Sequence, residues 1–250
     1  MKLDLPTICL VTSILFLIQA ARAVDIDLNG SADVTYMSRL MDKGGKYYGD
    51  EAALLQSVHL NIGDTGLGIT VAHRSALGGE FAAKERIDYK IGYGNTVFDG
   101  EAFQVNYGMG WVYHHHHNGG SVYPNYHEWE LSLKFPKLLP GGWVPSYKIA
   151  AEHGIGDTIA DADFWHQFAI SKSFEFESIP APIGFFADIA YRDGLGGINA
   201  WTHVTVGLDT QFEIIESLSL ASAVYHQFSL SDELTDEDVT YAVVSLKYDF

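Results

Sequence analysis

The chain ends on the stretch Tyr241–Phe250, YAVVSLKYDF, in which apolar and polar side chains alternate. Counting back by twos from the last residue gives Phe250, Tyr248, Leu246, Val244 and Ala242. Helical spacing does not produce a period of two residues, whereas a strand with a different solvent on each face does. The stretch therefore predicts a final β-strand with one apolar face.

The same alternation recurs along the chain. In residues 126–135, YHEWELSLKF, Trp129 and Leu131 fall on one face, and Glu128 and Glu130 fall on the other. We predict twelve strands, at 31–39, 54–62, 66–75, 85–94, 101–113, 126–135, 143–153, 163–175, 183–192, 201–212, 217–228 and 239–250. Most of them have roughly the 9–11 residues that a tilted transmembrane strand requires.

The connections between these strands alternate between short turns and longer loops. Residues 63–66, GDTG, form a tight turn, whereas residues 40–54 and 114–125 form long connections. Short turns on one rim and long loops on the other are typical of an outer-membrane barrel, with the turns on the periplasmic side. We therefore predict an all-β fold: a transmembrane antiparallel up-and-down β-barrel of 12 strands.

The first 23 residues have the pattern of a cleaved signal peptide. Lys2 precedes an apolar run from Ile8 to Ile18, and Ala21-Arg22-Ala23 forms an A-x-A cleavage site. A buried N-terminal helix is the alternative interpretation. We predict a signal peptide at 1–23 and one barrel domain at 24–250. The one cysteine, Cys9, leaves with the leader, so disulfides and thiol chemistry are not expected.

Charge and hydropathy narrow the functional classes. The formal net charge of −17 provides no basic stripe for phosphates, so we expect no nucleic acid as a partner. After residue 23, no apolar run approaches the roughly 20 residues of a transmembrane helix. An acidic soluble periplasmic protein and a membrane barrel both remain compatible with the composition.

Two observations favour a membrane barrel over a soluble barrel with an apolar interior. Twelve strands around an apolar interior would enclose a cavity too wide for side chains to fill. Aromatic residues that belong to the apolar faces of the strands also cluster near the strand ends, as in the aromatic girdles at bilayer interfaces. They are Trp111, Tyr113 and Trp129 near one rim, and Phe135, Trp143, Phe212, Tyr248 and Phe250 near the other. We therefore predict that the protein lies in the bacterial outer membrane.

Ionisable residues concentrate on the opposite parity, which would face the lumen. The predicted pore-lining residues are Asp33, Arg74, Arg86, Asp88, Lys90, Glu128, Glu130, Lys134, Lys148, Glu152, Asp188, Arg192, Asp209 and Lys247. Arg39 and Asp249 extend this set, which contains equal numbers of acidic and basic groups. A balanced lining predicts either a narrow passage of weak charge selectivity or a lumen closed by salt bridges.

Three other features suggest chemistry. His114 and His116 of the run 114–117 share the lumen parity, and two imidazoles suit Zn²⁺, Ni²⁺ or Cu²⁺. We favour a mobile polar loop there and predict no metal, no cofactor and no catalytic residue. His226 with Ser229 is the nearest candidate for a hydrolase pair. The acidic residues Asp161 and Asp163 and residues 232–238 are interpreted as a solvated face rather than a Ca²⁺ site.

Several stretches resemble the outer-membrane porin family labelled TorF. They are SADVTYMSRL (31–40), LLQSVHLNIGDTGL (54–67), ERIDYKIGYG (85–94), VYPNYHEWELSLKF (122–135) and the terminal YAVVSLKYDF. The resemblance implies a small barrel of poorly defined substrate without catalytic residues. The chain departs from the family after the first strand, where Arg39-Leu40 is followed by MDKGG.

The terminal strand also resembles the signal that the barrel assembly machinery reads, with Tyr248 and Phe250 as its aromatic residues and Ser245 where glycine is frequent. We therefore expect passive diffusion of small hydrophilic solutes. The alternatives are a closed structural or adhesion barrel with ligand-binding acidic loops and an outer-membrane hydrolase. Expected partners are outer-membrane lipids and lipopolysaccharide, the assembly machinery and small solutes.

Overall fold

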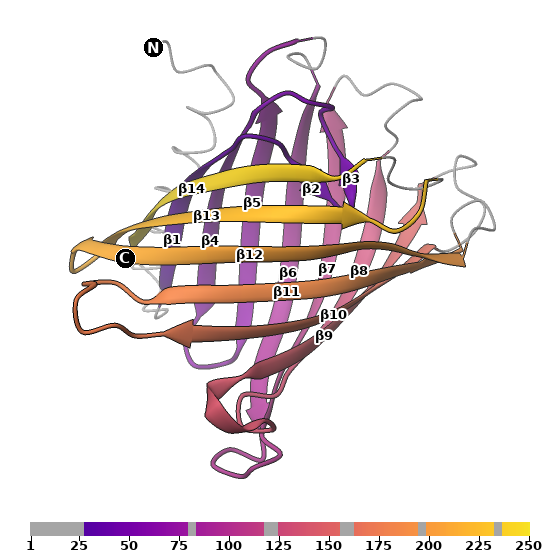
Figure 1. Ribbon diagram of the computed structural model, residues 1–250. Helices are drawn as coiled ribbons and strands as arrows, with labels where there is room; N and C mark the ends of the chain where they lie inside the picture. Colours follow the sequence, from indigo (N-terminus) through magenta and orange to yellow (C-terminus); the bar gives the residue numbers. More distant parts are fainter. Residues whose placement is uncertain (1–27, 80–83, 118–124, 156–162, 195–198, 233–236) are drawn as a thin grey trace.

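The computed structural model describes residues 28–79, 84–117, 125–155, 163–194, 199–232 and 237–250. In these residues, twelve antiparallel strands close into one barrel (Figure 1), which confirms the predicted fold and strand number. The barrel strands are β1 (Leu28–Met37), β4 (Ala53–Ile62), β5 (Leu67–Ala76), β6 (Glu85–Val97), β7 (Val105–His117), β8 (Tyr126–Lys134), β9 (Val144–Gly154), β10 (Asp163–Phe174), β11 (Ile183–Asp193), β12 (Asn199–Ile215), β13 (Leu218–Ser229) and β14 (Val239–Asp249).

In the part of the chain that the structure describes, three short elements lie outside the wall strands. β2 (Met41–Asp42) and β3 (Gly45–Lys46) form a small hairpin in the connection between β1 and β4. A 3₁₀ turn, η2 (Pro140–Gly142), lies between β8 and β9. No helix in the described part of the chain is long and apolar enough to cross a membrane.

The barrel closes where the last strand pairs with the first. Ser31 lies opposite Asp249, and Met37 lies opposite Val243. One step further along, Gly30 and Phe250 exchange two backbone hydrogen bonds of 3.0 Å each. A Cβ atom at Gly30 would lie 2.2 Å from the His59 carbonyl oxygen and 3.2 Å from the Phe250 ring. The seam therefore depends on a glycine that lets the terminal residue approach the wall.

Deleting Phe250 should lower the amount of barrel in the outer membrane severalfold. The deletion removes both terminal hydrogen bonds to Gly30 and the aromatic ring exposed beside the seam. Membrane fractions blotted for the barrel provide the measurement, with Phe250→Tyr as the control that keeps an aromatic end. Equal membrane levels of the deletion variant and the parent would show that Phe250 is dispensable for assembly.

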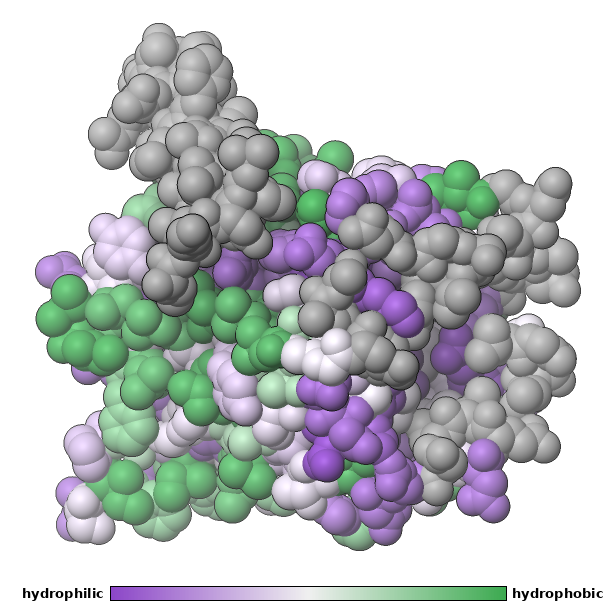
Figure 2. All heavy atoms as spheres, turned by 90° about the horizontal axis from the view of Figure 1, so that it is seen from above, coloured by the Kyte–Doolittle hydropathy of each residue, from purple (hydrophilic) through white to green (hydrophobic). Residues whose placement is uncertain are grey.

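The barrel is inverted relative to a soluble protein, with its large apolar side chains outward. Ile91 is 55% exposed and Trp129 is 58% exposed, whereas Arg86 and Glu128 are 1% and 4% exposed. Figure 2 shows hydrophobic residues gathered towards the left of the view and hydrophilic residues nearer its middle and right. A polar interior beneath an apolar outer surface is the arrangement of a membrane barrel.

The outer surface also contains the aromatic and cationic groups expected at bilayer interfaces. Trp143 packs edge-on against Phe174 and Phe185, with ring centroids 6.3 and 5.8 Å apart. Lys172 lies on the apolar, outward face of its strand, and its ammonium lies 5.4 Å from the centre of the Trp143 ring. A lysine with its charge at an aromatic girdle is typical of a membrane interface.

The structure corrects two sequence-based predictions of local structure. β7 continues to His117, so the histidine run is part of the barrel wall and not of a mobile loop. The two rims also differ less in connection length than predicted, because residues 135–143 and 175–182 are as long as residues 77–84 on the opposite rim. The large asymmetry comes from residues 38–52, the connection that contains β2 and β3.

Candidate functional site

The connection between β1 and β4, residues 38–52, is the feature that shapes the interior; we call it the hairpin loop. Its base is apolar, because Leu40 and Tyr48 pack with Ala53 and Ala76 of the wall as a buried cluster. The Tyr48 hydroxyl donates a hydrogen bond of 3.0 Å to the Arg74 carbonyl oxygen. This packing anchors the loop to β4 and β5 and directs its tip inward.

The tip of the hairpin loop is a tight turn that reaches the opposite wall. Asp42 pairs with Gly45, and the two residues between them have positive φ angles, 50° at Lys43 and 91° at Gly44. Positive φ at both central residues is typical of a two-residue hairpin turn. Gln227 of β13 is 2% exposed and donates a hydrogen bond of 2.7 Å to the Gly44 carbonyl oxygen. The tip therefore crosses the lumen.

Lys43 links the tip to two further wall strands. Its ammonium pairs with Glu128 of β8 and with Glu152 of β9. All three side chains are largely buried, with 11%, 6% and 14% of their surfaces exposed. Burial lowers the pKa of Lys43, but the carboxylates of Glu152 and Glu128 outweigh burial and raise that pKa above its ordinary value.

Asp42 binds the wall on the other side of the tip. The Arg86 Nη1 atom lies 2.6 Å from an Asp42 oxygen, and the Arg86 Nε atom lies 2.9 Å from Asp88. Burial raises the pKa of Asp42, but the charges of Arg86 and Arg74 outweigh it and hold the pKa well below its ordinary value. Arg86 therefore joins a tip carboxylate to a wall carboxylate.

These two pKa shifts indicate the pH range over which Asp42 and Lys43 themselves help to hold the tip in place. A lowered pKa means that Asp42 contributes stability above its unfolded-state pKa and loses that contribution as the pH falls through the folded-state value. A raised pKa means that Lys43 contributes below its unfolded-state pKa and loses that contribution as the pH rises through the folded-state value. Both contributions are therefore full between about pH 5 and pH 9.

The remaining charges around the tip are also paired. The Arg74 Nε atom lies 2.8 Å from Asp88. The Arg192 Nε atom donates to Asp163 at 2.7 Å, and its Nη2 atom lies 3.4 Å from Glu152. The tip is thus surrounded by a network in which each cation faces at least one carboxylate, which leaves little net field.

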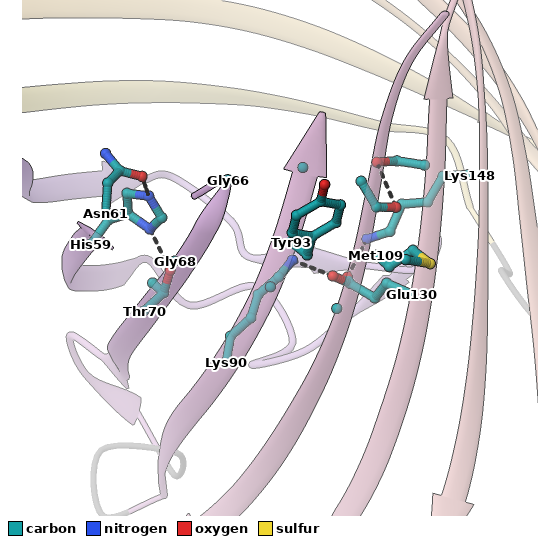
Figure 3. Close-up of a pocket in the computed structure, with 15 residues that line it drawn as sticks. His59, Asn61, Gly66, Gly68, Thr70, Lys90, Tyr93, Met109, Glu130 and Lys148 are labelled. Carbon is teal, nitrogen blue, oxygen red and sulfur yellow. Dashed lines mark hydrogen bonds and ion pairs between the residues drawn. The ribbon is translucent and has the colours of Figure 1, made fainter. Parts of the chain in front are cut away.

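A second region of the lumen is open. A cavity of about 550 Å³ lies along the inner wall of β4 to β9 (Figure 3). Lys90 and Lys148 approach the two oxygens of Glu130 from different strands, with Lys148 at 2.5 Å. On the other side, the His59 ring lies between Thr70 and Asn61, at 2.9 and 2.8 Å. Hydrogen-bonding groups surround this cavity, so it suits water and polar solutes.

Glycines on the inner face make room for the groups that line this cavity. A Cβ atom at Gly110 would lie 2.9 Å from Cε of Lys90. A Cβ atom at Gly68 would lie 2.7 Å from Cε1 of His59. The bare backbone therefore lets the Lys90 stem and the His59 ring lie flat against the wall, which widens the lumen below the hairpin tip.

The predicted pore-lining residues have the inner parity of their strands. The ones that contact the hairpin tip directly are Arg86, Glu128 and Glu152. Asp88 follows one contact further away through Arg86, Arg192 follows through Glu152, and Arg74 follows through Asp88. Lys90, Glu130 and Lys148 form a separate group of ion pairs that lines a cavity together with Asp42 and Lys43. Asp33 accepts hydrogen bonds from Ser57 and Thr35, and Asp188 from Gln167 and the Thr205 amide.

Five further predicted residues lie away from this network. Lys247 pairs with Asp249 at 2.7 Å near the end of β14, and both are about half exposed. Lys134 is exposed at the end of β8. Asp209 of β12 lies against the bare backbone of Gly184. Arg39, which the sequence placed in the lining, instead pairs with Asp50 within the hairpin loop at 3.1 Å.

His114 and His116 lie close to aromatic rings, and His114 also lies close to a carboxylate. The His114 Nδ1 atom lies 2.6 Å from Asp88, and the His114 ring stacks on Tyr126 at 4.2 Å. The His116 ring stacks between Tyr126 and Tyr47 of the hairpin loop, at 5.7 and 6.1 Å. In the described residues, no group of three or more His, Cys, Asp or Glu side chains is arranged to hold a metal ion.

The hydrolase candidate is not supported by the geometry. The His226 Nδ1 atom bonds with the Thr240 hydroxyl at 2.7 Å. Its neighbours Tyr225 and Gln227 line the lumen, so strand alternation places His226 on the outer face and Ser229 on the inner face. Of the acidic candidates, Asp163 pairs with Arg192, whereas Asp161 lies outside the described residues.

The hairpin loop is the part of the site that the sequence analysis missed. Its signal was the segment LMDKGGKYYG (40–49), which carries a two-glycine turn flanked by lysines and an apolar Leu and two Tyr. Large apolar residues in a long connection favour packing over solvation. The departure from the TorF pattern after Arg39 falls in this same segment.

The closed wall, polar lumen and apolar outer surface define an outer-membrane type of barrel, and solved structures show the same fold. A KdgM porin aligns with a TM-score of 0.57 at 11% identity, over 88% of this chain and 99% of that chain. A NanC porin aligns with a TM-score of 0.53 at 7% identity, over 88% and 100%. An outer membrane channel from Pseudomonas putida F1 aligns with a TM-score of 0.51 at 10% identity, over 90% and 96%.

No family model matches the chain, and no curated protein is significantly similar to it. At the identities of the solved structures, the likeness extends to the fold and not to a solute.

Proposed function

We propose that this barrel is an outer-membrane channel for the passive diffusion of small hydrophilic solutes, narrowed by the hairpin loop. The observation that carries the proposal is the hairpin tip, which crosses a polar lumen and contacts β6, β8, β9 and β13. A fixed constriction above an open polar cavity selects solutes by size. The mechanism uses no chemistry, so we propose that the protein is not an enzyme.

The charges around the constriction support weak charge selectivity. One solved KdgM porin is described in complex with a disordered oligogalacturonate, which is an acidic saccharide. In this chain, the cations near the tip are paired with carboxylates, as Arg86 is with Asp42 and Asp88. Cations that are already paired are poorly available to an acidic solute. We therefore do not propose an acidic saccharide as the solute of this channel.

We further propose that the protein is TorF-like, because the sequence stretches quoted above resemble that family. We also propose that its partners are outer-membrane lipids, lipopolysaccharide and the barrel assembly machinery. The apolar outer surface and the terminal Tyr248 and Phe250 support this proposal. The alternative is a closed structural barrel, which the density of ion pairs around Lys43 favours over an enzyme.

Recording from the refolded protein in planar bilayers tests the channel. We expect discrete openings of low conductance, and a reversal potential near zero in a tenfold salt gradient, because the lining charges are nearly balanced. A protein that inserts but stays electrically silent would contradict the channel and support the closed barrel. A strongly shifted reversal potential would contradict weak charge selectivity.

A further inference from the structure

A second cavity lies beside the hairpin tip, against the inner wall formed by β10 to β14. Its volume is about 280 Å³, and it is bounded on one side by Met41, Lys43 and Gly44 of the tip. The opposite side carries four aromatic rings, from Trp165, Phe186, Tyr225 and Tyr241. This cavity is separate from the one in Figure 3, which lies along β4 to β9.

The aromatic rings form a packed and oriented surface. Tyr225 stacks on Tyr241 with the ring centroids 5.2 Å apart, and it meets Phe186 edge-on at 6.2 Å. A Cβ atom at Gly207 would lie 2.1 Å from the Tyr225 ring. Gly207 therefore allows the Tyr225 ring to lie flat against the backbone of β12, at the edge of the cavity.

Hydrogen-bonding groups alternate with these rings. Asp188 is buried and held in place by Gln167, which donates to one oxygen, and by the Thr205 amide, which donates to the other at 3.1 Å. Gln227 is held by its bond to Gly44. Trp165 is 7% exposed, and in the described residues its Nε1 atom is buried without a hydrogen-bond partner. The polar groups are therefore oriented before any ligand arrives.

The charged groups around this cavity do not suit an anionic ligand. Asp188 is the carboxylate on its wall, and the Lys43 ammonium at its edge already pairs with Glu128 and Glu152. An anionic ligand would therefore meet a buried carboxylate without a free cation, which is costly. His203 also lines the cavity, with its Nε2 atom 4.0 Å from Asp188. The wall therefore disfavours an acidic saccharide.

We propose that this cavity is a binding site for one ring of a neutral saccharide. A sugar ring has apolar C–H faces that pack on aromatic rings, and hydroxyl groups at its edge that bond to carboxylates, amides and the indole N–H. A cavity that combines aromatic ring faces with oriented polar groups offers both kinds of contact. The inference deepens the proposed channel function, on which it rests, because it names the class of solute that passes the tip.

Saturation-transfer NMR on the refolded barrel in detergent micelles tests the site, with D-glucose and D-galactose as probes. We expect saturable transfer to at least one of these sugars, with a Kd on the order of 10 mM, which suits a solute that must also leave. Tyr225→Leu should weaken binding at least tenfold, because it removes the ring face. Gly207→Ala should do the same, because it displaces that ring without removing it.

Tyr89→Leu is the matched control, since Tyr89 is an exposed residue of the outer surface, and its binding should equal that of the parent. Circular dichroism confirms that each variant is a folded barrel before titration. Absence of saturable transfer, equal binding by Tyr225→Leu and the parent, or tighter binding of D-galacturonate would each overturn the proposal. Binding in micelles needs no open pore, so a barrel that binds glucose but is silent in bilayers would contradict only the channel.

Discussion

Replacing Met41–Lys46 by Asn-Gly should raise the single-channel conductance of the barrel severalfold. The replacement removes the tip that contacts Glu128, Glu152 and Gln227 across the lumen. It keeps the base, because Leu40 and Tyr47 are joined by a backbone hydrogen bond of 2.8 Å, and Asn-Gly is a preferred two-residue hairpin turn. The replacement removes two lysines but one aspartate, and it leaves Glu128 without its ammonium partner and Glu152 with Arg192 at 3.4 Å. The wider pore should therefore prefer cations.

The matched control places the same Asn-Gly turn on the opposite rim, at Asp64-Thr65 between β4 and β5. These residues lie outside the lumen network, so conductance and reversal potential should equal those of the parent. Planar-bilayer recordings of all three proteins provide the comparison. Equal conductance of the tip-replaced barrel and the parent would mean that the hairpin loop does not narrow the pore.

The second large effect is expected from Arg86→Met, which should lower the free energy of unfolding by about 3–5 kcal/mol. Arg86 is 1% exposed and pairs with both Asp42 and Asp88. Removing the guanidinium leaves the largely buried Asp42 without its ion-pair partner and leaves the buried Asp88 with only Arg74 and His114, which costs more than the pair itself contributed. Urea unfolding of the barrel refolded into lipid vesicles measures the change.

Removing a cation from an exposed ion pair is the matched control, because it separates the effect of burial on stability from the effect of losing a charge. Lys247 and Asp249 are 45% and 53% exposed, so Lys247→Met should cost less than about 1 kcal/mol. Adding Asp42→Asn to Arg86→Met should restore part of the lost stability, since it removes the carboxylate left without its partner, whereas Asp88 keeps Arg74 at 2.8 Å. A loss below 1 kcal/mol for Arg86→Met would contradict a structural role for this network.

The wall of the barrel could be predicted from the sequence because alternation is a local property. Each strand places one parity of side chains on each face, so residues such as Asp88 and Glu130 could be placed on the inner face from their own strands. Prolonged alternation also explains why the strand bounds agree within a few residues. The predicted strand 101–113 differs most, because the alternation continues through His114–His117 and the structure begins β7 only at Val105.

The partners of these side chains could not be predicted, because they depend on contacts between distant segments. Glu128 and Glu152 read as two like charges on neighbouring strands. In the structure, Lys43 lies between them and offsets their repulsion. Lys43 precedes Glu128 by 85 residues and Glu152 by 109 residues in the chain. Parity likewise put Arg39 in the lining, but the chain has already left β1 at Met37. A loop has no fixed side-chain period, so alternation carries no information there.

Uptake of a size series of neutral sugars into liposomes tests the central claim most directly, with the parent and the Asn-Gly tip replacement compared at equal protein. A constriction formed by the hairpin loop predicts that uptake by the parent falls steeply from glucose to tetrasaccharides. The tip replacement should flatten this dependence and admit the longer sugars. The same size dependence in both proteins would contradict the account.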